Sequence, residues 1–135
     1  MNKNKGFTMV ELLIVVAIMG IITAIAIPSY SGYVTESRRT DAKTLLLEAA
    51  GEQTRFFSEN NSYAASMTAM GYSDNSEPTE SGHYTVSVTA STASSFTLTA
   101  TAVGDQTSDT ECGNLTINSV GIKTESGTGT NADCW

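Results

Sequence analysis

The side chains most capable of chemistry are few in this chain of 135 residues: two cysteines, Cys112 and Cys134, and a single histidine, His83. Two thiols can form a disulfide in an oxidising compartment, whereas a structural zinc site takes about four ligands. Two cysteines and one distant histidine fall short of that number, so we predict no metal site. We expect one disulfide, Cys112–Cys134, and the alternative is two free thiols in a cytosolic protein.

Catalytic chemistry has little support in the sequence. We predict that His83 is a surface residue at the start of a strand rather than a general base. The sequence contains neither a Gly-x-Ser-x-Gly motif nor a phosphate-binding glycine loop. The acidic stretch Asp74-Asn75-Ser76-Glu77 lacks the alternating ligands and the glycine of a calcium-binding loop. We therefore expect neither an enzyme nor a bound cofactor.

One carboxylate, Glu11, lies within an apolar stretch that runs from Phe7 to Ile27. The stretch is about 21 residues or 31 Å long as a helix, enough to cross the hydrocarbon core of a membrane. A charge at such a depth costs on the order of 3 kcal/mol and usually marks a functional partner. The basic residues before the stretch favour a cytoplasmic N-terminus. A secretory signal cut after Ala24-Ile25-Ala26, a permanent anchor, and a precursor cut before the stretch are the competing interpretations.

The residues Gly6-Phe7-Thr8-Met9-Val10-Glu11-Leu12 resemble the processing motif of type IV prepilins, in which a short basic leader ends in glycine and a glutamate stands five residues beyond it. The resemblance implies a leader of residues 1–6, cut between Gly6 and Phe7 by prepilin peptidase, which also N-methylates Phe7. It implies that the apolar helix stays as a membrane anchor and later forms the filament core. Glu11 would then neutralise the amine of Phe7 on a neighbouring subunit during assembly.

The same resemblance implies partners and a location. The partners are other pilin subunits, the peptidase and methyltransferase, and the pilus assembly machinery of the inner membrane. The subunit would be anchored in the inner membrane and would then become part of an extracellular pilus on the cell surface.

Two consecutive helical segments must position Glu11. Residues 7–28 form the hydrophobic segment, and residues 29–58 carry apolar residues at three- and four-residue spacing, which predicts an amphipathic helix. Gly20 and Pro28 weaken the helix, through low helix propensity and the loss of a backbone donor respectively. In the family this stretch can unwind in the filament; a kink alone is the alternative. The predicted apolar face comprises Tyr30, Tyr33, Val34, Ala42, Leu45, Leu46, Ala49, Gln53, Phe56 and Phe57; a solvated face is expected for Arg38, Arg39, Lys43, Glu48, Glu52 and Arg55.

The remaining residues predict a small antiparallel sheet. Residues 59–82 are rich in turn formers and are expected to form a connecting loop. Residues 83–135 contain β-branched alternating runs at 84–89 and 95–101, joined by a predicted hairpin loop at 90–94, and a second hairpin at 115–123. A sheet packed on the amphipathic helix would bury both apolar faces, which gives an α+β fold. Together with the N-terminal motif, the resemblance implies the pilin fold.

The tail strengthens the resemblance. The residues 109–118 and 121–124, followed by Cys134-Trp135, look like the C-terminal pattern of small minor pilins. A Cys112–Cys134 bridge would close a disulfide loop and fasten the tail to the sheet. The lost chain entropy of the unfolded state corresponds to a stabilisation of about 3 kcal/mol. Trp135 is expected to pack on the core, with a receptor contact as the alternative.

The net charge of −7 makes nucleic acid an unlikely partner, because phosphate contacts need exposed cations. We predict a type IV pilus subunit, a minor pilin, that polymerises through its hydrophobic helix into a surface filament or primes one. The filament would serve adhesion, twitching motility or DNA uptake. The alternatives are a DNA-binding competence minor pilin and a pseudopilin of a type II secretion system.

Overall fold

A computed structural model describes residues 6–135, and the chain divides after Val34 into two units, named here by their bounds as Met1–Val34 and Thr35–Trp135. The first five residues, which belong to the predicted leader, lie outside the described residues. Helix α1 (Met9–Asn60) contributes to both units. Its sequence contains long apolar and straight-chain residues that favour helix, and it contains one proline, Pro28.

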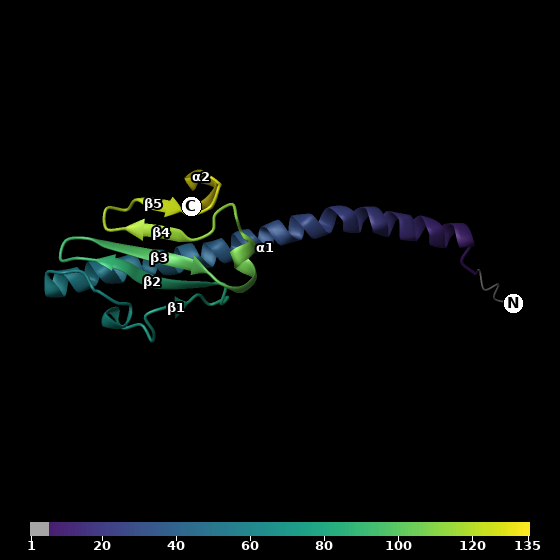
Figure 1. The fold of residues 1–135 in the computed structure, drawn as a ribbon. Helices are drawn as coiled ribbons and strands as arrows, with labels where there is room; N and C mark the ends of the chain where they lie inside the picture. The colour runs from purple at the N-terminus through teal and green to yellow at the C-terminus, as the bar shows by residue number, and fades with distance from the viewer. Residues whose placement is uncertain (1–5) are drawn as a thin grey trace. The chain divides into compact units, whose positions relative to one another are not determined.

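The unit Thr35–Trp135 contains five strands in one antiparallel sheet (Figure 1). They are β1 (Glu77–Pro78), β2 (Tyr84–Ser91), β3 (Phe96–Ala102), β4 (Leu115–Asn118) and β5 (Lys123–Glu125), in the order β1-β2-β3-β4-β5. Two 3-10 helices, η1 (Thr68–Met70) and η2 (Gly104–Ser108), and a short helix α2 (Asn131–Cys134) complete the unit. Every neighbouring pair is antiparallel, so short connections suffice.

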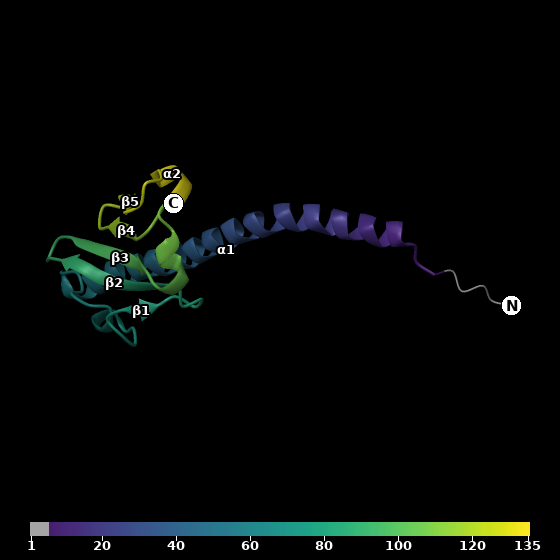
Figure 2. The same cartoon turned by 45° about the vertical axis from the view of Figure 1, so that its right-hand side comes forward.

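The core lies between the sheet and the part of α1 after Thr35, as Figures 1 and 2 show from two directions. Alternate residues of β2, β3 and β4 point to it, because successive side chains of a strand face opposite sides of the sheet. On α1 the buried positions recur at three- and four-residue spacing. The helix contributes Ala42, Leu46, Ala49 and Gln53, and the strands contribute Tyr84, Val86, Phe96, Leu98, Ala100, Leu115 and Ile117. The α+β arrangement expected from the sequence is confirmed.

Several local expectations differ from the structure. The predicted loop at 59–82 contains η1 and the two-residue strand β1. Pro78 fits there because β1 is an edge strand, which tolerates a missing backbone donor. Strand β2 continues to Ser91, past a register shift between Val88 and Ala90, into the predicted hairpin loop. Tyr30 and Tyr33, predicted on the apolar face, are exposed in the unit Met1–Val34.

Candidate functional site

Glu11 and Thr8 close the start of helix α1 with a reciprocal capping pair. The Glu11 Oε2 atom accepts hydrogen bonds from the Thr8 backbone N at 3.1 Å and from Thr8 Oγ1 at 3.0 Å. The Glu11 backbone N donates in return to Thr8 Oγ1 at 3.2 Å. Such a pair satisfies backbone donors that the first helical turn leaves free. One carboxylate oxygen holds these bonds, so the other can accept from a cation brought by another molecule.

The segment around Glu11 is apolar on every side. All residues from Phe7 to Pro28 are exposed in the chain, and Phe7 itself is 79% exposed. Helix α1 is long and apolar enough there to cross a membrane, by length and composition. A helix that is hydrophobic all round needs an apolar environment on all sides, which lipid or other helices can provide. Glu11 is the only charged residue between Gly6 and Thr35.

Helix α1 continues through both predicted weak points. Gly20 and Pro28 lie inside the helix, and Pro28 has no N–H to donate to the Ala24 carbonyl. The Thr23 hydroxyl donates to the Met19 carbonyl at 2.6 Å, and the Ser31 hydroxyl donates to the Pro28 carbonyl at 2.9 Å. These hydroxyls compete with backbone N–H groups for helix carbonyls close to Gly20 and Pro28. Unwinding of this stretch in a filament stays a prediction.

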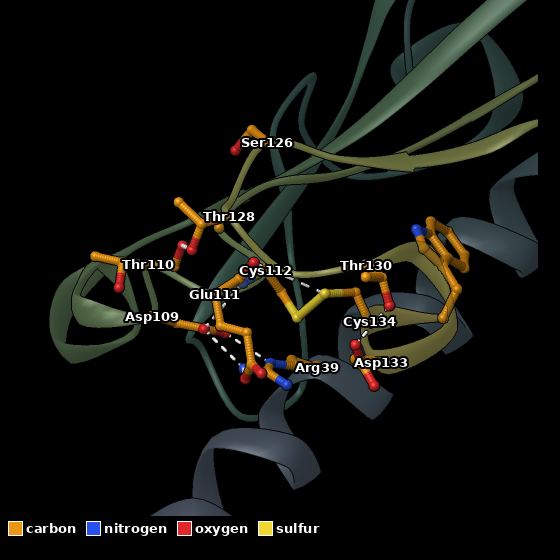
Figure 3. The surroundings of a disulfide bond; sticks show 12 residues. Arg39, Asp109, Thr110, Glu111, Cys112, Ser126, Thr128, Thr130, Asp133 and Cys134 are labelled. Carbon is orange, nitrogen blue, oxygen red and sulfur yellow. Dashed lines mark hydrogen bonds and ion pairs between the residues drawn. A yellow bond between two sulfur atoms is a disulfide. The ribbon is translucent and has the colours of Figure 1, made fainter.

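The predicted disulfide is present and joins η2 and its following turn to the C-terminal helix. The sulfur atoms of Cys112 and Cys134 are bonded, and both residues are fully buried. Figure 3 shows the bond beside the segment 109–112. The backbone passes very close here, because a Cβ added to Gly127 would lie 2.1 Å from the Glu111 carbonyl oxygen. The tail therefore depends on both the covalent bond and a glycine.

A buried ion pair beside the disulfide ties the helix to the tail (Figure 3). Arg39 Nε donates to Asp109 Oδ2 at 2.7 Å, and Arg39 Nη2 donates to Asp109 Oδ1 at 2.7 Å. Arg39 Nη2 also donates to Glu111 Oε2 at 2.9 Å. The two-pronged geometry fits the planar guanidinium to a carboxylate. The pair thus links α1 to the segment that carries Cys112.

Further polar groups complete the Asp109 environment. Gln106 Nε2 donates to Asp109 Oδ2 at 3.1 Å and to the Tyr84 hydroxyl at 3.2 Å, and the Cys112 backbone N donates to Asp109 Oδ1 at 3.2 Å. Burial acts to raise the pKa of Asp109, but the hydrogen bonds and charge of Arg39 and the Cys112 N–H outweigh it, so this pKa lies below its usual value. The hydrogen bonds that Arg39 donates to the Asp109 carboxylate raise the pKa of Arg39. Both groups are therefore charged at neutral pH.

The expectation that Arg39 belongs to a solvated face is wrong, since Arg39 is only 8% exposed. The positions Arg39, Ala42 and Leu46 share one face of the helix, at spacings of three and four residues. That spacing could have revealed the burial, but the charge of Arg39 and its neighbour Arg38 favoured the solvated interpretation. A partner carboxylate some 70 residues away gives no local signal in the sequence.

The carboxylates at this site do not form a free ligand set for a metal. Oxygen or sulfur atoms of Asp109, Glu111 and Cys112 lie within 4.8 Å of one another. Cys112 is bonded to Cys134, so its sulfur is not a thiolate, and both carboxylates bind Arg39. The arrangement serves to hold the tail, because its charges are already paired.

Trp135 packs against the edge of the sheet. Its indole Nε1 donates to the Thr124 carbonyl at 3.0 Å, and the Lys123 ammonium lies 5.1 Å from the centre of its ring. The predicted core contact of Trp135 is confirmed, because this partly buried side chain packs against the hydrophobic core as well as beside β5.

Two family models match the chain. A model described as "Prokaryotic N-terminal methylation motif" matches residues 1–27, and a model described as "Type IV minor pilin ComP, DNA uptake sequence receptor" matches residues 28–116. Together they account for most of the chain, and they meet where the hydrophobic segment ends.

Individual relatives of this chain are also pilin or fimbrial proteins. The chain is 43% identical over 70 residues to the type IV major pilin protein PilA of Myxococcus xanthus, which covers 52% of this chain and 32% of the relative. It is 38% identical over 92 residues to the fimbrial protein EcpC of Eikenella corrodens, which covers 68% of this chain and 58% of the relative. The chain thus spans from about a third to somewhat over half of these relatives.

A solved structure shares the fold. A type IV pilin from Shewanella oneidensis aligns with a TM-score of 0.51 and 28% identity, over 75% of this chain and 97% of that one. The resemblance to type IV pilins that the sequence indicated is confirmed, as is the pilin fold. The chain is a type IV pilin and belongs to the family described as the type IV minor pilin ComP, DNA uptake sequence receptor.

Proposed function

We propose that this chain is a minor subunit of a surface filament, made as a membrane-anchored precursor and assembled through the apolar half of α1. Its role is structural rather than catalytic. Prepilin peptidase cuts between Gly6 and Phe7, and the new Phe7 amine is N-methylated. The subunit waits in the inner membrane until the assembly machinery adds it to the filament.

The proposal is supported by the apolar segment from Phe7 to Pro28, in which every residue is exposed. Leaving this apolar surface in contact with water costs about 25 cal/mol of free energy for each Å². The segment therefore has to stay in lipid until it can enter a bundle of like segments from other copies. Such head-to-tail packing that does not close into a ring produces a helical filament.

Glu11 sets the position of one subunit along its neighbour. Its free carboxylate oxygen accepts from the Phe7 amine of the adjacent copy, while Thr8 continues to hold the other oxygen. An apolar bundle makes an unpaired charge expensive, and removing one member of a buried pair typically costs about 3–5 kcal/mol. Only the register that joins the two charges is then stable.

The test replaces Glu11 with alanine in cells that produce the filament. We expect Glu11→Ala to be processed and inserted in the membrane at normal amounts, and sheared filaments to contain about a hundredfold less of the variant or none, as the lost pair requires. Immunoblots of membrane and sheared fractions measure both. Normal incorporation of the variant would contradict the assignment.

Glu36 provides a matched control. It is also an exposed glutamate of α1, but it lies beyond the apolar segment. We expect Glu36→Ala to enter filaments as the parent does. If both alanine variants failed equally, the effect would come from lost acidity in general and not from a charge inside the apolar bundle.

DNA binding is a second candidate, supported by the description of the matched family as a DNA uptake sequence receptor. The charges of this chain weigh against strong binding, since the unit Thr35–Trp135 contains five Lys and Arg against thirteen Asp and Glu. Arg39 and Arg55 are held in ion pairs, and Lys123 lies on Trp135. Arg38 and Lys43 remain as cations with no ion pair among residues 6–135.

Fluorescence anisotropy with a short DNA duplex, repeated over a range of salt concentrations, tests this candidate on the full chain in detergent micelles. Two phosphate contacts give a slope of log K against log salt of about −2. Binding with that slope, which the double variant Arg38→Gln/Lys43→Gln abolishes, would support DNA recognition. Absence of binding at low salt would reject it and would leave filament assembly untouched.

A further inference from the structure

Strand β5 forms one edge of the sheet, and α2 with Trp135 lies beside it (Figures 1 and 2). Asn118 N donates to the Ile122 carbonyl, and Ser126 N donates to the Asn114 carbonyl. Backbone groups of a strand alternate in direction, so Ile122 and Ser126 face β4, while Lys123 and Glu125 face the outer edge. An edge of this kind can pair with a strand of another chain.

The C-terminal residues cover this edge with side chains. Asn131 Nδ2 donates to the outward-facing Lys123 carbonyl at 2.5 Å, and Trp135 Nε1 donates to the Thr124 carbonyl at 3.0 Å. The Lys123 ammonium lies over the Trp135 ring. We define Asn131–Trp135 as the edge cap. The disulfide at Cys134 fixes the cap to the segment that contains Cys112.

The sequence of β5 is self-complementary. When two copies of Lys123-Thr124-Glu125 pair in antiparallel fashion about Thr124, each Lys123 faces the Glu125 of the other copy. Opposite charges placed directly across two strands stabilise their pairing. Glu125 Oε2 has no hydrogen-bond partner among residues 6–135, so this carboxylate oxygen is not already paired within the described chain.

We propose that the edge cap is a redox latch over a strand-addition surface for a second copy of this chain. With the disulfide closed, the cap occupies Lys123 and its carbonyl, and the edge is blocked. When a dithiol reductant opens the bond, the sulfur–sulfur bond breaks, two protein thiols form and the reductant is oxidised to its own disulfide. The cap is then released, and two β5 edges pair.

The latch acts as a check on maturation. A subunit whose disulfide is open associates through its sheet edge, in a symmetric pair that cannot extend. Closing the disulfide removes this side reaction, so that the apolar helices are left as the contact between copies. The proposal concerns a surface of the unit Thr35–Trp135 and does not depend on Glu11 or on processing.

Cysteine cross-linking at Thr124 tests the pairing in the full chain in detergent micelles. Thr124 is the centre of the predicted pair, so Thr124→Cys residues of two copies would face each other. With Cys112→Ser and Cys134→Ser opening the latch, we expect a mild oxidant to give cross-linked dimer about tenfold faster than in the protein with the natural disulfide, a ratio that two cross-strand ion pairs can produce. Equal rates in both backgrounds would overturn the proposal.

Charge exchange tests the register of the pair. In the opened background, Lys123→Glu places like charges across the strands, and we expect the cross-linking rate to return to the closed level. Adding Glu125→Lys restores opposite charges and should restore the rate. A Lys123→Glu protein that cross-links as fast as its parent would overturn the proposed pairing.

Two controls separate uncapping from unfolding. Ser94→Cys, in the exposed β2–β3 loop, should cross-link at the same rate in the open and closed backgrounds. Asn131→Ala with Trp135→Phe removes both side-chain donors of the cap while the disulfide remains, and we expect it to raise the Thr124→Cys rate. If opening the disulfide removed the β-sheet signal in circular dichroism, the variant with Asn131→Ala and Trp135→Phe would test the proposal alone. An unchanged Thr124→Cys cross-linking rate in that variant would overturn the proposal.

Discussion

Arg39 and Asp109 join the helix to the tail through a buried ion pair, so removing one partner leaves the other charged without a counter-ion. We expect Arg39→Ala to lower the free energy of unfolding by about 3–5 kcal/mol. Urea unfolding of the full chain in micelles, followed by circular dichroism, measures the loss. The double variant Arg39→Met/Asp109→Leu should recover most of it, because neither charge remains. If Arg39→Ala lowered the free energy of unfolding by less than about 1 kcal/mol, the pair would contribute no more than an ion pair on the solvent-exposed surface.

Glu111 provides the contrast at the same guanidinium. Its side chain is 58% exposed, so water screens its pairing with Arg39. We expect Glu111→Gln to change the free energy of unfolding by less than about 1 kcal/mol. Thermal unfolding compares it with Arg39→Ala. Equal losses would mean that Glu111, and not Asp109, is the principal partner of Arg39.

The lowered pKa of Asp109 makes stability depend on acid. The folded unit releases this proton more readily than the unfolded chain, so the contribution is complete above the unfolded pKa, about 3.9, and is lost as pH falls through the folded pKa. We expect Asp109→Asn to be less stable than the parent at neutral pH, with the difference shrinking below about pH 4. Urea unfolding at several pH values measures this convergence, and parallel curves at all pH values would contradict it.

Elements with a repeating pattern were predictable from the sequence, and those fixed by single contacts were not. The alternating β-branched runs indicated β2 and β3, and the apolar spacing indicated the buried face of α1. Strand β1 has only Glu77 and Pro78, too few residues to show alternation. Helix α2 and η2 are held by the disulfide and by Asp109, whose partners lie far away in the sequence. The capping pair of Thr8 and Glu11 matched a known signature that the membrane interpretation of Glu11 overlooked.

The backbone at residue 127 passes close to the backbone of residues 111–112, and this approach depends on Gly127. A Cβ there would lie within 3 Å of three backbone atoms of Glu111 and Cys112, none of which belongs to a flexible side chain. We expect Gly127→Ala to destabilise the unit by about 3 kcal/mol. Gly51→Ala is the matched control, because Gly51 lies in α1 with open space around it, and it should stabilise by about 1 kcal/mol. A tolerated Gly127→Ala would mean that the tail can move away from Glu111.

The chain combines an apolar helical segment, Phe7 to Pro28, whose residues are all exposed, with the acidic, disulfide-closed unit Thr35–Trp135. In the proposed function the apolar segment is the contact between copies, and the like acidic charges of two units weaken association through them. The closed disulfide holds the edge cap in place. We propose that assembly then proceeds through the exposed apolar segment from Phe7 to Pro28.

Intact and N-terminal peptide mass spectrometry of the protein recovered from sheared filaments tests whether the apolar helix belongs to the assembled subunit. We expect a chain that begins at Phe7, bears one methyl group on its amine and gains two hydrogens on reduction of the Cys112–Cys134 disulfide. A chain that begins at Ile27 would mean cleavage by an ordinary signal peptidase. The apolar helix and Glu11 would then be absent from the mature protein, and assembly through them would be contradicted.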